Sequence, residues 1–303
     1  MKILFTLLIY LTNPDYKILF FGHAYGSGDI ENKAGKSFTN YINKYTDDHD
    51  LFVFGGDFIK NCNSSFEIDN FKQTINKLYD NSIFIYGNHE FYCYDSDHFE
   101  FIKKHENSSL IINDNILFFV NSNFENINQV KELVNTISLN SNYSKIFIFN
   151  HQTFYEKNDL LLHTNSREFY ELGYKFVEKI NALNHSNIYF ISGDIGSSIF
   201  QHDLIYYKKN NINMLASGLG NGNNNYGLEI VFNQRDKVSF NKLDLDSNER
   251  IKLYPKNRMI IYAENVFLYL MLKIRSPKFI GLISFLIIMI LFRLNYRSNN
   301  QSF

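Results

Sequence analysis

The stretch Ser82-Ile83-Phe84-Ile85-Tyr86-Gly87-Asn88-His89-Glu90 indicates most clearly how this chain folds. Its first five residues form a mostly apolar run that is typical of a buried strand. Gly87 allows the backbone to turn sharply where that strand ends, and three polar side chains of different chemistry follow at once. Open α/β sheets bind their ligands at the carboxyl ends of the strands. The stretch therefore predicts a strand that ends in a ligand-binding turn.

Polar residues follow four other predicted strands in the same way. The endings read Phe-Phe-Gly-His23, Phe-Gly-Gly-Asp57, Phe-Asn-His151-Gln152 and Ile-Ser-Gly-Asp194. A single His or Asp after a strand is more often a hydrogen-bonding loop residue than a ligand. All of these endings together predict one shared site, and its imidazole, amide and carboxylate groups suit Mn, Fe or Zn better than Ca.

Short apolar runs alternate with helical patterns over the first two thirds of the chain. The predicted strands are Lys17–Phe21, Leu51–Phe54, Ser82–Tyr86, Ile116–Val120, Lys145–Phe149 and Ile188–Ser192. The predicted helices are Lys33–Tyr45, Ile68–Leu78, Asp97–His105, Ile127–Ile137 and Ser166–Leu183. Successive strands with Asn- and Gly-rich turns then follow, at Leu204–Lys208, Asn213–Ala216, Gly227–Phe232 and Val238–Leu245. This order predicts an α/β fold in which helices cover the faces of a sheet.

The motifs and their order resemble the calcineurin-like metallophosphoesterase superfamily over about residues 17–232. The family pattern is D-x-H, G-D-x-x, G-N-H-E/D, a lone His after a strand, and G-H-x-H. This chain has Gly56-Asp57-Phe58-Ile59 for the second motif, Gly87-Asn88-His89-Glu90 for the third and Asn150-His151 for the fourth. The resemblance implies a four-layer α/β/β/α sandwich that hydrolyses phosphoesters with the help of divalent metal ions.

The first and last motifs depart from the family pattern. The first reads Phe21-Gly22-His23, so the Asp is missing, and the last reads Gly193-Asp194-Ile195-Gly196, so Asp and Gly replace both His residues. In the family, the first motif and the second His of the last motif bind the same metal ion, so that site loses two ligands here. The other site loses only the first His of the last motif, which Asp194 replaces.

The resemblance implies one firm metal site and one weaker site. Asp57, Asn88 and His151 are retained for the first site, with Asp194 in place of a His. Only His23 and Asp57 are retained for the second, where His23 would assist a weaker metal or bind the substrate phosphate. The resemblance also places His89 near the leaving group as a proton donor, so His89 and Asp57 are the expected catalytic residues. Glu90 is expected to support the turn and not to bind metal.

Three functions are compatible with these motifs. The first is an active phosphomonoesterase or phosphodiesterase that acts on a phosphorylated small molecule or on a lipid- or glycan-linked phosphate. The second is a catalytically impaired relative that binds phosphate ligands or a protein partner, and the altered first and last motifs motivate it. The third is a membrane scaffold without metal, which leaves the repeated polar strand endings unexplained.

Net charge and cysteine content limit the partners and the cellular compartment that we expect for the protein. The formal charge of −1 provides no basic field for nucleic acid, so no nucleic-acid partner is expected. Cys62 and Cys93 form no CxxC pair, and two unrelated thiols are the preferred interpretation. A single bridge between them is the alternative if the domain is exported.

The two ends of the chain are apolar. Residues 279–292 carry no charge, which predicts a transmembrane helix over 276–296, preceded by a juxtamembrane segment over 251–275. The metallophosphoesterase domain then covers 13–250, and residues 1–12 form a signal or anchor segment, or contribute an extra buried strand. We expect a single-pass membrane protein. The basic residues that flank the predicted span favour a domain on the cytoplasmic side of the membrane, whereas a working signal sequence would place it on the outer side. The side of the catalytic domain therefore stays undetermined.

Overall fold

The computed structural model describes most of the chain in two compact units, Met1–Arg258 and Met259–Phe303. The described residues are 6–9, 15–25, 35–93, 99–103, 105–153, 170–195, 204–219, 225–233, 237–257, 259–261, 263–264 and 267. Within these ranges no helix is both long and apolar enough to cross a membrane. The predicted span over 276–296 lies outside them.

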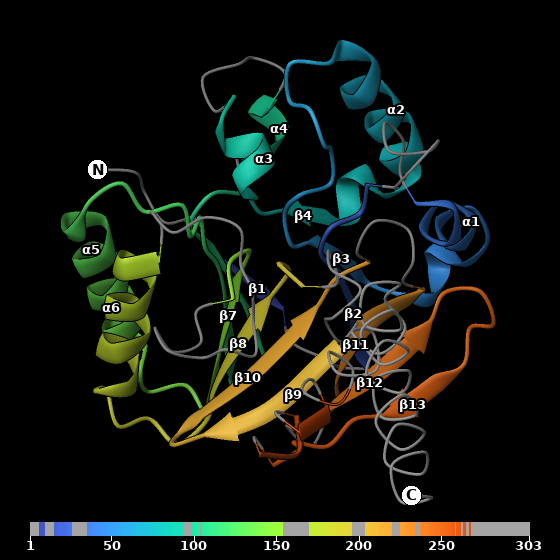
Figure 1. Ribbon diagram of the computed structural model, residues 1–303. Coiled ribbons are helices and arrows are strands. Elements are labelled where there is room, and N and C mark those ends of the chain that lie inside the picture. The colour runs from blue at the N-terminus through green and yellow to red at the C-terminus, as the bar shows by residue number, and fades with distance from the viewer. Residues whose placement is uncertain are drawn as a thin grey trace, which may run out of the picture. The chain divides into compact units, whose positions relative to one another are not determined.

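The first unit contains two β-sheets (Figure 1). The seven-stranded sheet has the order β1 (Thr6–Ile9), β5 (Ser108–Ile112), β6 (Asn115–Phe119), β7 (Lys145–Asn150), β8 (Ile188–Ser192), β10 (Ile212–Ser217) and β9 (Leu204–Lys209). The six-stranded sheet has the order β13 (Arg250–Lys252), β12 (Val238–Asp244), β11 (Tyr226–Phe232), β2 (Tyr16–Phe21), β3 (Leu51–Phe54) and β4 (Ser82–Phe84). Strands β2, β3 and β4 pair in parallel, as do β7 and β8, so each set ends at one edge of its sheet.

Alternating side chains of β2 explain why the sheets pack face to face. Ile18 and Phe20 enter a core that the two sheets share, and the ring of Phe20 lies 5.8 Å from that of Phe149 on β7. Leu19 and Phe21 enter a second core on the opposite face. Successive residues of a strand point to opposite faces, so one strand that is buried on both sides supplies both cores.

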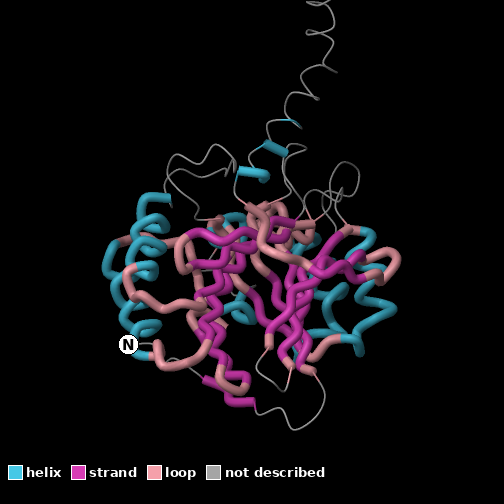
Figure 2. The backbone as a smooth tube through the Cα atoms, turned by 90° about the horizontal axis from the view of Figure 1, so that it is seen from below, coloured by secondary structure: helices cyan, strands magenta, loops and turns pink. Residues whose placement is uncertain are grey.

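Helices cover the outer face of each sheet (Figures 1 and 2). The six-stranded sheet packs against α1 (Lys36–Tyr45) and α2 (Ser65–Ile75), and the seven-stranded sheet against α5 (Ile127–Leu139) and α6 (Tyr170–Asn181). For example, the ring of Phe176 on α6 lies 5.7 Å from that of Phe190 on β8. The short helices are η2 (Thr46–Asp48), η3 (Asn76–Asn81), α3 (Asn88–Phe91) and α4 (Glu100–Lys103). The predicted α/β sandwich is confirmed.

Several elements differ from the sequence prediction. The prediction missed strands β5 and β13, and the predicted helix over Asp97–His105 is described as helical only in α4 and at residue 99. The apolar run at the N-terminus contains β1, which pairs in parallel with β5 and so matches the extra-strand alternative for that run. The predicted helix over Ile68–Leu78 begins earlier, because the Ser64 hydroxyl accepts a hydrogen bond from the backbone N–H of Glu67 at 3.3 Å and caps α2.

Candidate metal centre

Five predicted site residues converge at the carboxyl ends of the strands, and we refer to them as the metal cluster. Oδ2 of Asp57 lies 3.4 Å from Nε2 of His151 and 3.5 Å from Nε2 of His23. Nε2 of His151 lies 3.2 Å from Oδ1 of Asn88, and Nε2 of His23 lies 3.1 Å from Oδ1 of Asp194. Two atoms that each bind one cation at about 2 Å are separated by roughly 3 Å, so these spacings fit a metal site.

The histidines of the metal cluster are buried and suitably oriented. Nδ1 of His151 lies 2.8 Å from the carbonyl oxygen of Gly55, which can only accept, so Nδ1 carries a proton and Nε2 is the ring nitrogen that would bind a metal ion. Nδ1 of His23 is also buried, and no described residue is its hydrogen-bond partner. Ligand atoms of His23, His151 and Asp194 all lie within 4.8 Å of one another. These donors fit a divalent transition metal.

Opposite charges lie close together in the metal cluster. Burial acts to raise the pKa of Asp57, but the charges of His151 and His23 outweigh it and hold that pKa well below its usual range. Burial acts to lower the pKa of His151, but the charge and hydrogen bond of Asp57 outweigh it and raise that pKa. Asp57 therefore stays ionised and can attract a cation.

Glu90 holds the turn that carries Asp57. Its carboxylate is fully buried, and Oε2 accepts hydrogen bonds from the backbone N–H groups of Asp57 and Gly87, each at 2.9 Å. Oε1 accepts from Phe58 at 2.9 Å and from Ile59 at 3.1 Å. Burial, followed by the charge of Asp57, raises the pKa of Glu90 to about 7. Glu90 thus ties the loop after β3 to the turn after β4 without entering the metal cluster.

The backbone beside Asp57 has a conformation that only a few residue types adopt readily. Gly56 has a φ of 85°, and Asp57 and His23 have positive φ values of 54° and 49°. A Cβ atom on Gly56 would lie 2.6 Å from Nδ1 of His151. Glycine therefore lets the β3 loop approach the histidine so closely.

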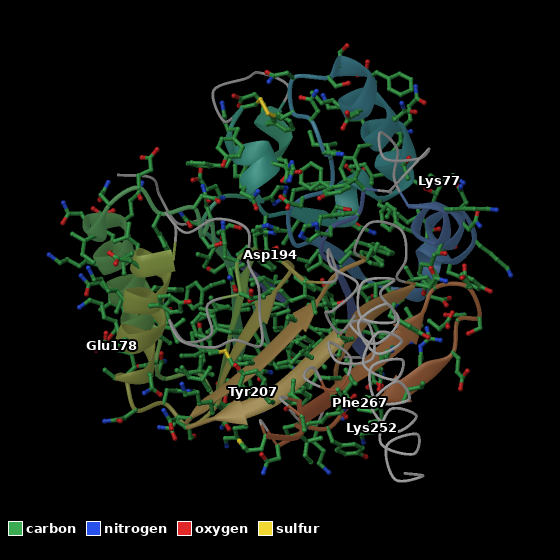
Figure 3. The ribbon with its side chains drawn as sticks, in the orientation of Figure 1. Lys77, Glu178, Asp194, Tyr207, Lys252 and Phe267 are labelled. Carbon is green, nitrogen blue, oxygen red and sulfur yellow. A yellow bond between two sulfur atoms is a disulfide. The ribbon has the colours of Figure 1, made fainter. Side chains whose placement is uncertain are left out.

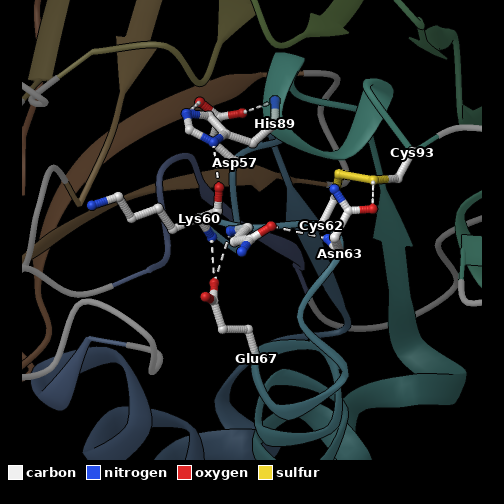
Figure 4. Close-up of a disulfide and its surroundings, with 8 residues drawn as sticks. Asp57, Lys60, Cys62, Asn63, Glu67, His89 and Cys93 are labelled. Carbon is white, nitrogen blue, oxygen red and sulfur yellow. Dashed lines mark hydrogen bonds and ion pairs between the residues drawn. A yellow bond between two sulfur atoms is a disulfide. The ribbon is translucent and has the colours of Figure 1, made fainter.

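His89 lies beside the metal cluster and remains partly accessible. Its backbone N–H donates to Oδ1 of Asp57 at 3.1 Å, and its Nε2 lies 4.0 Å from Oδ2 of the same residue. Nδ1 of His89 donates to the carbonyl oxygen of Lys60 at 2.6 Å (Figure 4). The side chain is 31% exposed, so Nε2 can reach a bound molecule. A pocket of about 530 Å³ opens there, lined by residues that include Asn61, Asn63 and Tyr92.

A disulfide bridge between Cys62 and Cys93 borders the same pocket (Figure 4). The preference for two unrelated thiols was therefore wrong, and the bridged alternative holds. Cys62 lies five residues after Asp57, and Cys93 lies three residues after Glu90. The bridge thus joins the same two loops that Glu90 joins, with a Cα–Cα distance of 5.9 Å.

Tyr25 also faces the metal cluster, although no motif in the sequence assigns it a role. Its ring lies 5.5 Å from that of His23 and 5.6 Å from that of His89. Burial, followed by the charges of Asp57, Glu90 and Asp194, raises the pKa of the Tyr25 phenol. Asp29, His202 and Asp203, whose side chains could also replace a lost metal ligand, lie outside the described residues.

Two polar residues behind His151, Ser122 and Asn123, were not predicted from the sequence. The Ser122 hydroxyl accepts hydrogen bonds from the backbone N–H groups of His151 and Gln152, each at 3.3 Å, and donates to the Gln152 side chain. Asn123 accepts from Nε2 of Gln152 at 2.5 Å and donates to the carbonyl oxygen of Gly87 at 3.4 Å. The Ser-Asn pair that begins three residues after the end of β6 was the available signal, because it repeats the pattern of polar residues that follow a strand.

Phe21, which stands where the family has an Asp ligand, points away from the metal cluster. Its ring packs in the second core, 5.1 Å from that of Phe38 and 6.1 Å from that of Phe54. The side chain is 1% exposed. A core residue therefore stands in the place of the missing Asp ligand. Gly196, which stands in the place of the family's last His, lies outside the described residues.

Comparisons with known proteins agree with this fold. The family model for calcineurin-like phosphoesterases matches residues 30–218, more than half of the chain, and this segment contains Asp57, Asn88, His151 and Asp194 but excludes His23. No curated protein sequence matches the chain.

Solved structures provide a further comparison. A purple acid phosphatase from seeds of yellow lupin (Lupinus luteus) is similar with a TM-score of 0.53 at 9% identity, over 83% of this chain and 55% of that one. This chain thus spans about half the length of the lupin protein, and the likeness concerns the fold alone. A predicted phosphoesterase from Streptococcus pneumoniae TIGR4 shows a TM-score of 0.35 at 7% identity, over 80% of this chain and 100% of that one. With its sequence matched over more than half its length, this chain belongs to the calcineurin-like phosphoesterase family.

Proposed function

We propose that this protein is a metal-dependent phosphoester hydrolase. The observation that carries the proposal is the position of Asp57, whose Oδ2 atom is shared between Nε2 of His151 and Nε2 of His23. Asp57, Asn88, His151 and Asp194 would hold one divalent Mn, Fe or Zn ion firmly. His23, with Asp57 and Asp194, would assist a second, weaker ion or contact the substrate phosphate.

Bound metal would activate a water molecule as nucleophile and stabilise the charge on the phosphoryl oxygens. The chain itself supplies the proton for the leaving group. Because Nδ1 of His89 donates to the Lys60 carbonyl, Nε2 is the ring atom beside Asp57 from which a proton would pass to the leaving group. The pocket next to His89 gives the leaving group a place to bind. Its substrate would be a phosphorylated small molecule or a lipid- or glycan-linked phosphate.

Activity measurements with added Mn²⁺ test this function. We expect the full chain to hydrolyse p-nitrophenyl phosphate or its bis-ester, and Asp57→Ala and His151→Ala to abolish the activity. His185→Ala is the matched control, since His185 bonds to the carbonyl of Tyr143 and lies outside the metal cluster. Absence of activity on both substrates, or its survival in the Asp57→Ala variant, would refute the proposal.

A catalytically impaired phosphate-binding protein is the second candidate, and the position of Phe21 favours it. Because Phe21 lies in a hydrophobic core, the weaker metal position lacks the Asp that the family pattern provides. In that case Mn²⁺ and inorganic phosphate would bind with one metal per chain, and neither substrate would be hydrolysed. Metal analysis together with the activity assay separates the two candidates.

The protein would work at a membrane surface. The uncharged stretch 279–292 supports a single-pass anchor over 276–296. The Cys62–Cys93 bridge supports a catalytic domain on the oxidising side of that membrane, because disulfides persist in such compartments. We expect the full chain to stay with membranes after carbonate extraction, and protease added outside sealed vesicles or cells to show on which side the domain lies.

A further inference from the structure

A second pocket, of about 570 Å³, lies at the end of the strands remote from the metal cluster. Lys145 lines this pocket and is the first residue of β7, whereas His151 directly follows the last residue of that strand. A strand of this length spans roughly 20 Å, so the two sites are separate. Figure 3 shows Lys252, which also lines the pocket, at the lower end of the strands and Asp194 at their upper end. We call it the basal pocket.

The basal pocket is rich in positive charge. Lys145, Lys237 and Lys252 come from three different parts of the first unit and line one cavity. No acidic residue is among the described residues that line it. Lys237 and Lys252 are exposed, so both ammonium groups are accessible to a ligand from solvent. An anion that binds in this pocket would be attracted by the positive charge of these lysines.

Aromatic side chains form the floor of the basal pocket. The ring of Phe240 lies 5.4 Å from that of Tyr189 and 5.4 Å from that of Tyr206. Leu253, which also lines the pocket, is held beside these rings, because its backbone N–H donates to the carbonyl oxygen of Phe240 at 2.8 Å. Tyrosine and lysine together suit a ligand with one apolar part and one anionic part, as in the interfacial zone of a membrane.

The position of the basal pocket along the chain indicates which ligand it would meet. Leu253, Tyr254 and Pro255 line it, and the first unit ends at Arg258. The uncharged stretch 279–292 follows about 20 residues later in the sequence. We propose that the basal pocket is a second, non-catalytic binding site for the phosphate-bearing headgroup of an anionic lipid.

Titration of the full chain in dodecyl maltoside tests this site. The probes are dihexanoyl phosphatidylglycerol, dihexanoyl phosphatidylcholine and inorganic phosphate, with EDTA present so that the metal cluster does not contribute. The double variant Lys237→Gln/Lys252→Gln should weaken phosphatidylglycerol binding by about 10- to 30-fold, from about 1 kcal/mol per lysine near an anionic surface. Lys131→Gln/Lys179→Gln is the matched control, with the same charge change on exposed lysines of α5 and α6.

The outcomes differ clearly. Tighter binding of phosphatidylglycerol than of phosphatidylcholine, weakened only by the basal-pocket variant, supports the proposal. Inorganic phosphate that displaces phosphatidylglycerol in a Lys237- and Lys252-dependent way also supports an anion site, with a free phosphate ester as its ligand. Equal binding of both lipids, or equal weakening by both double variants, overturns it. Unchanged hydrolysis of p-nitrophenyl phosphate by the basal-pocket variant with Mn²⁺ would confirm that the variant is folded, and lost hydrolysis in that variant alone would overturn the separation of the two sites.

Discussion

The backbone N–H of Asp57 donates a 2.9 Å hydrogen bond to the buried carboxylate of Glu90. Because the same carboxylate accepts three further N–H groups, Glu90→Gln would turn an amide N–H₂ toward donors that need an acceptor. We expect a loss of at least roughly 2 kcal/mol in the free energy of unfolding. Hydrolytic activity should fall by about 10- to 100-fold, since Asp57 is no longer held in place.

Urea unfolding and the Mn²⁺-dependent assay measure both effects of Glu90→Gln. Glu100→Gln is the control, because the Glu100 side chain is 64% exposed and pairs only across one helical turn with Lys103. Similar losses in both variants would show that the buried carboxylate of Glu90 has no special role.

Phe21→Asp restores the family's first motif in sequence, yet we expect it to damage the protein. The new carboxylate would lie in the aromatic core beside Phe38 and Phe54, and not in the metal cluster. Removal of the ring alone should cost roughly 3–5 kcal/mol. Thermal unfolding measures this loss, with Phe66→Asp as a control, because Phe66 is 56% exposed on α2. A stable Phe21→Asp variant that binds an additional metal ion would contradict the observed packing.

Gly56→Ala should lower both stability and activity. An alanine there would adopt a φ of 85° and bring its Cβ within 2.6 Å of Nδ1 of His151. Strain of this kind costs roughly 1–3 kcal/mol and would displace the ring from the metal cluster. Gly35→Ala is the matched control, since its Cβ would lie 3.8 Å from the nearest atom, the carbonyl oxygen of Ala24. If the two variants hydrolyse substrate equally well, the close approach at Gly56 is not needed.

The disulfide should contribute to stability even though it is not part of the metal cluster. Cys62 and Cys93 are separated by 31 residues, and closing a loop of that size stabilises a fold by about 3–4 kcal/mol. Cys62→Ser/Cys93→Ser, or reduction with dithiothreitol, should lower the melting temperature accordingly. Thiol titration of the unreduced protein should detect no free thiol. Two reactive thiols in that sample would argue against the bridge.

Acid should weaken the attachment of β13 through Glu229. Burial acts to raise the pKa of Glu229, but hydrogen bonds from His49, Arg250 and Asn241 outweigh it and lower that pKa from 4.5 to about 2. Because the pKa of Glu229 is lower in the folded protein than in the unfolded one, its carboxylate stabilises the fold at pH values above about 4.5. This contribution disappears as the pH falls from about 4.5 to about 2. The loss should reach roughly 3 kcal/mol.

Acid unfolding of the Glu229→Gln variant checks this contribution. The wild-type protein should lose stability more steeply than the variant across that pH interval, because only the wild-type protein gains a proton at position 229. If the stability of both proteins falls in parallel with pH, the pKa of Glu229 is not lowered in the folded protein.

The sequence indicated much of the metal cluster, because Asp57, His151 and Asp194 each follow an apolar strand with a polar or glycine residue before them. Parallel pairing brings the ends of β2 and β3 together in one sheet and those of β7 and β8 together in the other. The two sets of residues meet only because the two sheets pack against each other. The alternation of side chains along β2 also predicts where the Phe21 ring lies, because Leu19 and Phe21 point to the same face of the strand and enter the same core.

Other features depend on packing between segments that are distant in sequence. The pairing of Cys62 with Cys93 follows only once the β3 loop and α3 lie side by side, which neither cysteine reveals alone. Strand β5 was missed although Asn113-Asp114 follows it, a residue pair that suits the two-residue turn of a hairpin. In the structure Asn113 adopts the positive φ that such a turn requires, 53°. The basal pocket draws its lysines from three separate segments, so no local pattern predicts it.

Strand β1 has a consequence for any processing of the N-terminus. It forms the outer edge of the seven-stranded sheet and pairs there with β5 through Thr6–Ile9. Cleavage after residue 12 would therefore leave the backbone N–H and carbonyl groups on one side of Ser108–Ile112 without their strand. Such an unpaired border readily recruits a strand from another molecule. A shortened protein would thus be prone to self-association through this edge, so the first residues shield the sheet as well as complete it.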